Sequence, residues 1–167
     1  KPDGFAAEVF LPEPANLRDL KEKKYLLILD RIRDPGNLGT LLRTAAALGW
    51  EGVVFTPGTV DLFNDKALRA SKGAAFLLPY CRLETGEIDS LLREKQFAVY
   101  LADIEGRPFD QISYSPRLAL ILSSEAAGPN SWSENYVKIT IPMAPQVESL
   151  NVASSGAILL YAMRQSQ

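Results

Sequence analysis

Histidine is absent from these 167 residues, and Cys81 is the only cysteine. Without histidine the chain lacks the commonest general base and the commonest metal ligand of proteins, so a Ser-His-Asp triad is excluded. A single cysteine can form neither an intramolecular disulfide nor a zinc site built from several thiolates. We therefore expect no bound metal, and a reducing, cytoplasmic location.

Long apolar runs and a surplus of positive charge are also missing. The longest runs, 118–122 and 157–163, fall far short of the roughly 20 residues that cross a bilayer, so no membrane span is expected. With Lys+Arg 18 and Asp+Glu 20, the net charge of −2 argues against capture of nucleic acid by the whole surface. Any contact with RNA or DNA must be a local patch. The G-x-G-x-x-G and P-loop signatures of common nucleotide sites are absent as well.

What is present is the composition of one soluble domain, 47% hydrophobic and 23% charged. Prolines in the first two dozen residues, followed by the charged stretch 20–24, predict an extended lead-in with a short helix. We interpret residues 1–24 as a linker and 25–167 as the main domain. Because the first residue is Lys1 rather than Met, we expect an N-terminal domain in a longer protein.

Short apolar runs alternate with segments of helical length from Tyr25 onward. Their apolarity is continuous rather than alternating, which is typical of strands buried on both faces. The sequence therefore predicts an α/β fold, a mostly parallel sheet with helices on both faces. The expected strands are 25–29, 52–55, 76–80, 97–101, 118–122 and 137–141.

Two expected helices differ in their apolar faces. In 37–48 the large apolar residues form one stripe, and Arg43 lies opposite it among small residues. Arg43 is either a plain solvent-facing charge or a residue whose small neighbours let a ligand approach. In 149–164 apolar residues point in every direction, so either the rest of the chain or another subunit must cover this helix.

Three loops follow expected strands, at the edge where open α/β sheets place ligands. They are Asp34-Pro35-Gly36-Asn37-Leu38-Gly39, Ser123-Ser124-Glu125-Ala126-Ala127-Gly128 and 142–151. Singly, each has an ordinary explanation: a turn before a helix, a solvated Glu125, and Ser149 as the cap of the last helix.

In order, with Arg43 six residues after Asn37, the loops resemble the motifs of the SpoU family, also called TrmH, of RNA ribose methyltransferases in the SPOUT superfamily. The first motif, 34–45, and the third, Ile141-Pro142-Met143 with Glu148-Ser149-Leu150-Asn151-Val152, are nearly complete, and 61–75 is similar to the linking segment. The second departs from the usual Gly-x-Glu-Gly-x-Gly. It has Ser123 and Ala126 in place of glycines, which matters where the backbone needs a positive φ or touches a ligand.

The resemblance implies a C-terminal trefoil knot, which general folding rules would not suggest. It also implies a homodimer with the active site at the subunit interface, and S-adenosylmethionine as cofactor. The residues it assigns to the cofactor are Ser123, Ser124, Glu125, Ile141, Met143, Leu150 and Asn151.

The implied reaction is methyl transfer to a ribose 2′-OH of structured RNA, with rRNA preferred over tRNA. The family's proposed agent of proton removal is the first-motif arginine, here Arg43. Because a guanidinium is normally protonated, Arg43 could instead clamp the RNA phosphate and acidify the hydroxyl. Asn37, Glu125, Ser149 and Asn151 would fix the geometry. The candidate RNA contacts are Arg31, Arg33, Arg43, Lys66, Arg69 and Lys72.

Two other functions stay open. The altered second motif would suit a catalytically weak RNA-binding or assembly protein that keeps the fold. A small-molecule α/β enzyme could use Glu125 as a base, although that leaves the Arg43 motif unexplained.

Overall fold

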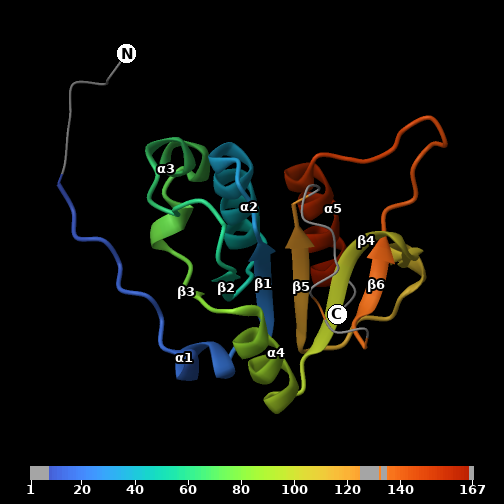
Figure 1. Cartoon of the computed structure of the whole chain (residues 1–167), viewed down its shortest axis with the longest axis horizontal. Helices are drawn as coiled ribbons and strands as arrows, with labels where there is room; N and C mark the ends of the chain where they lie inside the picture. Colours follow the sequence, from blue (N-terminus) through green and yellow to red (C-terminus); the bar gives the residue numbers. More distant parts are fainter. Residues whose placement is uncertain (1–7, 125–131, 133–134, 166–167) are drawn as a thin grey trace.

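A six-stranded sheet runs through the middle of the computed structural model, which describes residues 8–124, 132 and 135–165 (Figure 1). The strands are β1 (Tyr25–Asp30), β2 (Gly52–Phe55), β3 (Tyr80–Arg82), β4 (Ala98–Pro108), β5 (Leu118–Ser123) and β6 (Val137–Thr140). Their order is β3-β2-β1-β5-β4-β6, and every pairing is parallel. The carboxyl ends of β1, β5, β4 and β6 therefore meet at one edge, the upper one in Figure 1.

Helices cover both faces of the sheet, as the sequence predicts. The helical segments are α1 (Leu17–Lys21), α2 (Pro35–Ala47), α3 (Asp65–Ser71), α4 (Thr85–Glu94) and α5 (Val152–Gln165), with the short 3₁₀ turns η1 (Ala74–Phe76) and η2 (Phe109–Gln111). Alternate β1 residues enter separate cores: Leu27 and Leu29 join α2 and α5, while Leu26 and Ile28 join α4. This arrangement explains why the strand runs are apolar without alternation.

One expected strand is wrong. Residues 76–80 do not form a strand; η1 occupies 74–76 and β3 begins only at Tyr80. Lys72 and Gly73 adopt positive φ angles of 51° and 89°, which end α3 and turn the chain, and Leu77 is left 74% exposed. An apolar run therefore marks a surface turn here, not a buried strand.

The long strand β4 ends in a bulge beside β6. The pairing register shifts between Ala102 and Arg107, so that both residues oppose Ile139. A Cβ on Gly106 would lie 2.5 Å from the Ile139 backbone, so only glycine permits this approach. The bulge carries β4 past the expected end at residue 101.

The burial of α2 and α5 can be compared with the apolar faces expected from the sequence. The α2 stripe is buried as expected, but Gly39, expected on the opposite face, is buried too, because α3 packs so closely that a Cβ would meet Ala70 at 2.6 Å. The rest of this chain does not cover α5 on all sides, so its cover by another subunit stays a prediction. Leu159 and Leu160 are buried, whereas Ile158 and Tyr161 are 38% and 56% exposed.

The lead-in follows the outer edge of the sheet rather than standing free. Its Ala15 N–H donates to the Tyr80 carbonyl at 2.7 Å, and the Tyr80 hydroxyl donates to the Pro12 carbonyl at 2.9 Å. Helix α1 lies three residues earlier than the expected 20–24. No helix in the described part of the chain is long and apolar enough to cross a membrane.

Candidate active site at the carboxyl edge of the sheet

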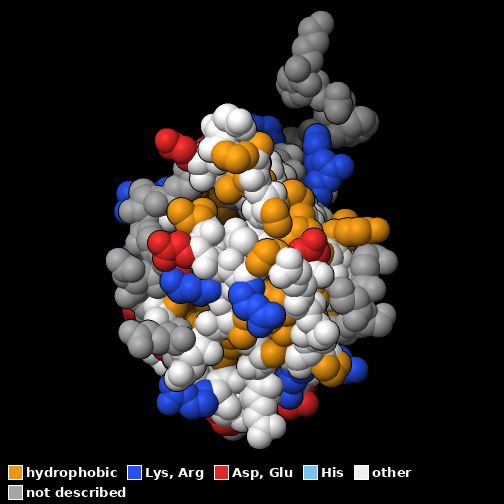
Figure 2. Space-filling view, turned by 90° about the vertical axis from the view of Figure 1, so that its right-hand side faces the viewer, with side chains coloured by type: hydrophobic (Ala, Val, Ile, Leu, Met, Phe, Trp, Pro, Cys, Tyr) orange, Lys and Arg blue, Asp and Glu red, His pale blue; other side chains and the backbone are white. Residues whose placement is uncertain are grey.

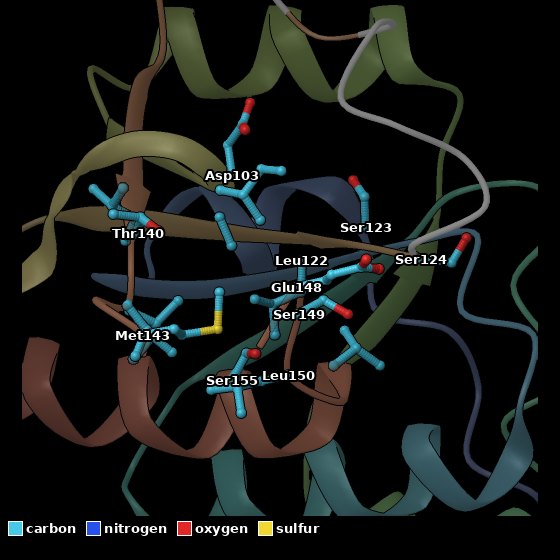
Figure 3. A pocket seen from close by; sticks show the side chains of 16 residues that line it. Asp103, Leu122, Ser123, Ser124, Thr140, Met143, Glu148, Ser149, Leu150 and Ser155 are labelled. Atoms are coloured by element: carbon cyan, nitrogen blue, oxygen red, sulfur yellow. The ribbon is translucent and has the colours of Figure 1, made fainter. Parts of the chain in front are cut away.

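A cavity of about 380 Å³ opens where β4, β5 and β6 end and α5 begins (Figure 3). It brings together most of the residues that the sequence assigns to a cofactor, from two separate segments of the chain. These are Ser123, Ser124, Ile141, Met143 and Leu150, joined by Ser149. The fold thus assembles the second and third motifs into one hollow.

The cavity walls combine apolar surface with a few hydroxyls. Leu122, Ile139 and Leu159 are buried in the core behind it, and the Met143 side chain points into the middle of the group (Figure 3). Ser124 Oγ is buried and has no hydrogen-bond partner within the described residues. Such a buried hydroxyl is a group that a polar ligand would satisfy.

Two acidic residues that sequence reasoning missed also line the cavity. Glu148 points toward its centre (Figure 3), and its only signal was its place in the third motif. Asp103 accepts from Lys138 Nζ at 2.7 Å. Burial would raise the pKa of Asp103, but the Lys138 ammonium and the Glu105 N–H hold it below its usual value.

Asn37 and Asn151 connect the first motif to the third. Asn151 Nδ2 donates to Asn37 Oδ1 at 3.1 Å, across 114 positions of sequence. Asn37 is placed by the N-cap of α2, where Asp34 Oδ1 accepts from the Asn37 N–H at 2.8 Å. That N–H, with Lys66 Nζ at 3.1 Å, keeps the pKa of Asp34 below its usual value.

The cap of α5 is Asn151 rather than Ser149. Asn151 Oδ1 accepts from the N–H groups of Ala153 at 2.9 Å and Ser154 at 3.4 Å. The ordinary explanation of Ser149 as the helix cap is therefore wrong, and Ser149 lines the cavity instead.

Arg43 is exposed on α2, with Thr40 and Ala47 exposed beside it, as the helical pattern predicts. It does not line the cavity of its own chain. Glu125, with the rest of 125–131, lies outside the described residues, so its predicted role stays a prediction.

The candidate RNA contacts fall into two groups. Arg31, Lys66 and Arg69 each pair with a carboxylate, from Asp30, Asp34 and Asp65 respectively. The other three form no ion pair with any residue that the structure describes. These are Arg33, Arg43 and Lys72.

The departure at position 123 is accommodated without backbone strain. Ser123 ends β5 and is not one of the described residues with a positive φ. Its hydroxyl donates to Asp30 Oδ2 at 2.9 Å, so this side chain has no second hydrogen to donate to a ligand. No group of three or more metal-ligating side chains occurs within the described residues.

Comparisons with known proteins agree on one family. Residues 24–161 match the model of the SpoU rRNA Methylase family. The chain is 36% identical to the 23S rRNA (guanosine(2553)-2′-O)-methyltransferase RlmP of Bacillus subtilis. The alignment covers 98% of this chain and 65% of that relative. The chain thus spans less than two thirds of that relative.

Solved structures give the same result. An AdoMet-bound rRNA methyltransferase from Sinorhizobium meliloti superposes with a TM-score of 0.85 at 30% identity, covering 92% of this chain and 61% of that one. The SpoU methyltransferase AviRb from Streptomyces viridochromogenes, in complex with AdoMet, superposes with a TM-score of 0.83 at 26% identity. That superposition covers 92% of this chain and 65% of AviRb.

Proposed function

Since the chain belongs to the SpoU rRNA methylase family, we propose that it transfers a methyl group from S-adenosylmethionine to a ribose 2′-OH of RNA. The observation that carries the proposal is the cavity that joins the second and third motifs, tied to the first motif by the Asn37–Asn151 bond. Large-subunit rRNA is the preferred substrate and tRNA the second choice, because RlmP and other similar proteins are named 23S rRNA methyltransferases.

The cavity suits S-adenosylmethionine in size and chemistry. Its apolar walls match the adenine ring, and the Ser124 hydroxyl, which has no hydrogen-bond partner among the described residues, offers a polar contact. We assign the adenine and ribose to the backbone of Ser123, Ile141 and Leu150, with Met143 against the ring and with Asn151 and Glu125 completing the site. S-adenosylmethionine supplies an electrophilic methyl group on a sulfonium.

Arg43 holds and activates the RNA. Its guanidinium forks onto a phosphate next to the reacting ribose, and its charge lowers the pKa of the 2′-OH so that water or another group takes the proton. Asn37 and Asn151, fixed by each other, limit the positions that the ribose can take, with Ser149 and Glu125 beside them. Arg33 and Lys72 extend the phosphate contacts, with Arg31, Lys66 and Arg69 as secondary contacts.

A homodimer completes the site. Arg43 does not line its own cavity, and α5 exposes Ile158 and Tyr161, an apolar surface that a second copy would cover. Figure 2 shows further hydrophobic side chains spread over the right-hand face of Figure 1, and the exposed Val137 and Val147 belong to β6 and the loop before α5. We further propose that the third motif and α5 form the trefoil knot.

The division of the chain and its location are proposals of the same kind. Residues 1–24 act as a linker after an N-terminal RNA-binding domain, and 25–167 as the methyltransferase domain. The cytoplasm suits Cys81, a free, buried thiol whose pKa is raised to about 12 by burial.

Calorimetric titration with S-adenosylmethionine, with RNA binding measured in parallel, tests the function. Saturable one-to-one binding of the methyl donor is the expected result. RNA binding without any binding of the donor would instead establish the second candidate, an assembly protein, which the altered second motif favours. Binding of neither would contradict both.

A further inference from the structure

Asp30 is a buried carboxylate at the end of β1 that the proposed chemistry does not use. It is 2% exposed. Thr56 Oγ1 and Arg31 Nε donate to its Oδ1 at 2.7 and 3.1 Å. Its Oδ2 accepts from Arg31 Nη2 and Ser123 Oγ, both at 2.9 Å, and from Trp132 Nε1 at 3.2 Å. Five donors therefore meet one carboxylate.

This cluster is organised around a charge. Arg31 neutralises Asp30 with a two-pronged contact, and it adopts a φ of 53° that few residues other than glycine take. Its N–H donates to Thr56 Oγ1 at 3.0 Å, which orients that hydroxyl toward Asp30. Burial opposes the charged form, yet the hydrogen bonds from Arg31, Thr56, Ser123 and Trp132 hold the pKa of Asp30 below its usual value.

The donors to Oδ2 include the first residue of the second motif and a residue that follows the motif. Ser123 begins that motif at the end of β5, and Trp132 follows it. The Ser124 N–H donates to the Asp30 carbonyl at 3.1 Å. Asp30 therefore binds Ser123 through its side chain and Ser124 through its backbone. Ser123 and Ser124 also form a wall of the cavity.

We propose that Asp30 is a positioning residue for the methyl donor, acting through Ser123 and Ser124 to fix the wall of the cavity, while Trp132 helps to hold the Asp30 carboxylate in place. The inference rests on the proposed function, because the ligand it positions is S-adenosylmethionine. Glycine, the usual family residue at position 123, has no side chain to make this bond. In this chain the Ser123 hydroxyl therefore adds a hydrogen bond to a buried charge.

The test compares two single-bond deletions with a matched control. Ser123→Ala and Trp132→Phe each remove one donor to Oδ2. Thr59→Val removes a buried hydroxyl from the same end of β1, where it donates to the Leu29 carbonyl at 3.0 Å without touching Asp30. We expect Ser123→Ala and Trp132→Phe to raise the Kd for S-adenosylmethionine about tenfold, the scale of a lost hydrogen bond to a charged group. Thr59→Val should lower Tm by about as much as Ser123→Ala and Trp132→Phe do, and it should leave the Kd for S-adenosylmethionine unchanged.

A double-mutant cycle identifies Asp30 as the residue through which Ser123 acts. In an Asp30→Asn background, Ser123→Ala should add less than a twofold change in Kd, because the bond it removes is already lost. If Asp30→Asn fails to fold, the single variants decide the question. Equal effects of all three single variants on Tm with no change in Kd would overturn the inference and leave a purely structural role.

The outcome for the parent chain separates this inference from the function it rests on. A parent that binds S-adenosylmethionine while Ser123→Ala binds equally well overturns the positioning role alone. A parent that does not bind contradicts the proposed function and this inference together.

Discussion

The two halves of the sheet's carboxyl edge differ in chemical character. Over β1, β2 and α3 the edge carries exposed cations, including Arg33 and Lys72, and the cavity does not extend there. Over β5, β4 and β6 it is hollowed into a mostly apolar cavity with hydroxyls in its wall. One half suits a polyanion and the other a compact, partly apolar molecule, which are the two kinds of substrate that an RNA methyltransferase must bring together.

The two halves are not independent, because two polar links join them. The Asn37–Asn151 bond connects α2 to the start of α5, and the Asp30 cluster connects the end of β1 to the end of β5. Both links lie at the carboxyl edge of the sheet. A substitution in one half can therefore change the position of residues in the other half.

Replacing Arg43 should have the largest effect and should distinguish the functions of the two halves, because it changes methyl transfer without changing cofactor binding. We expect Arg43→Ala to reduce the rate of methyl transfer about 100-fold or more, the scale for removing a charge-stabilising group. The Kd for S-adenosylmethionine should hardly change, since the contacts proposed for it come from the second and third motifs. Single-turnover methylation and calorimetry measure the two quantities.

Arg43→Lys is the matched variant for that experiment. It should recover little activity, because a point charge does not reproduce a two-pronged contact with phosphate. A folded, dimeric Arg43→Ala protein that methylates RNA at the parent rate would refute the assignment, and Glu125 would be the next residue to replace.

Salt should affect the two halves unequally. If Arg33, Arg43 and Lys72 each neutralise a phosphate, RNA affinity should fall about twentyfold between 50 and 200 mM salt. The affinity for S-adenosylmethionine should stay nearly constant, because its cavity is mostly apolar. Filter binding and calorimetry at matched salt would check this, and a flat RNA affinity would rule out the patch.

Breaking the Asn37–Asn151 link tests how strongly the halves are coupled. Asn151→Ala removes both the cap of α5 and the bond to Asn37, while Asn37→Ala removes only the bond. Loss of a helix cap costs about 1 kcal/mol, so Asn151→Ala should be less stable by about that amount and bind the methyl donor several-fold more weakly. Equal stability of the two variants by chemical denaturation would show that the cap contributes nothing.

The smallest effect is expected among the cations themselves. Lys66 is paired with Asp34 at 3.1 Å, whereas Lys72 forms no ion pair within the described residues. Lys72→Ala should therefore weaken RNA binding and reduce the slope of log affinity against log salt by about one, and Lys66→Ala should have a smaller effect on both. A larger loss for Lys66 would show that RNA displaces Asp34.

The centre of the sheet followed from the sequence because three of its six strands are buried on both faces. β1, β2 and β5 read as continuous apolar runs and lie close to their expected positions. The run at 76–80 misled because apolarity alone does not distinguish a strand from a turn with exposed Leu77. The signal against it was Lys72-Gly73, where glycine permits the positive φ that turns the chain.

The sequence predicted the site residues that belong to the motifs. It did not predict the residues that only the fold brings to the site. The cavity contains Ser123, Met143 and Leu150, all assigned in advance. Asp103 and Asp30 carry no local signal, since each is simply an acidic residue within or at the end of an apolar strand. Their importance arises from the residues that parallel neighbours place beside them, Lys138 and Ser123.

The methyl-transfer activity can be tested in cells by mapping ribose methylation in total RNA with and without the gene. We expect one 2′-O-methyl group of large-subunit rRNA to disappear with the gene and to return with the parent protein but not with Arg43→Ala. An unchanged methylation map in rRNA and tRNA would contradict it.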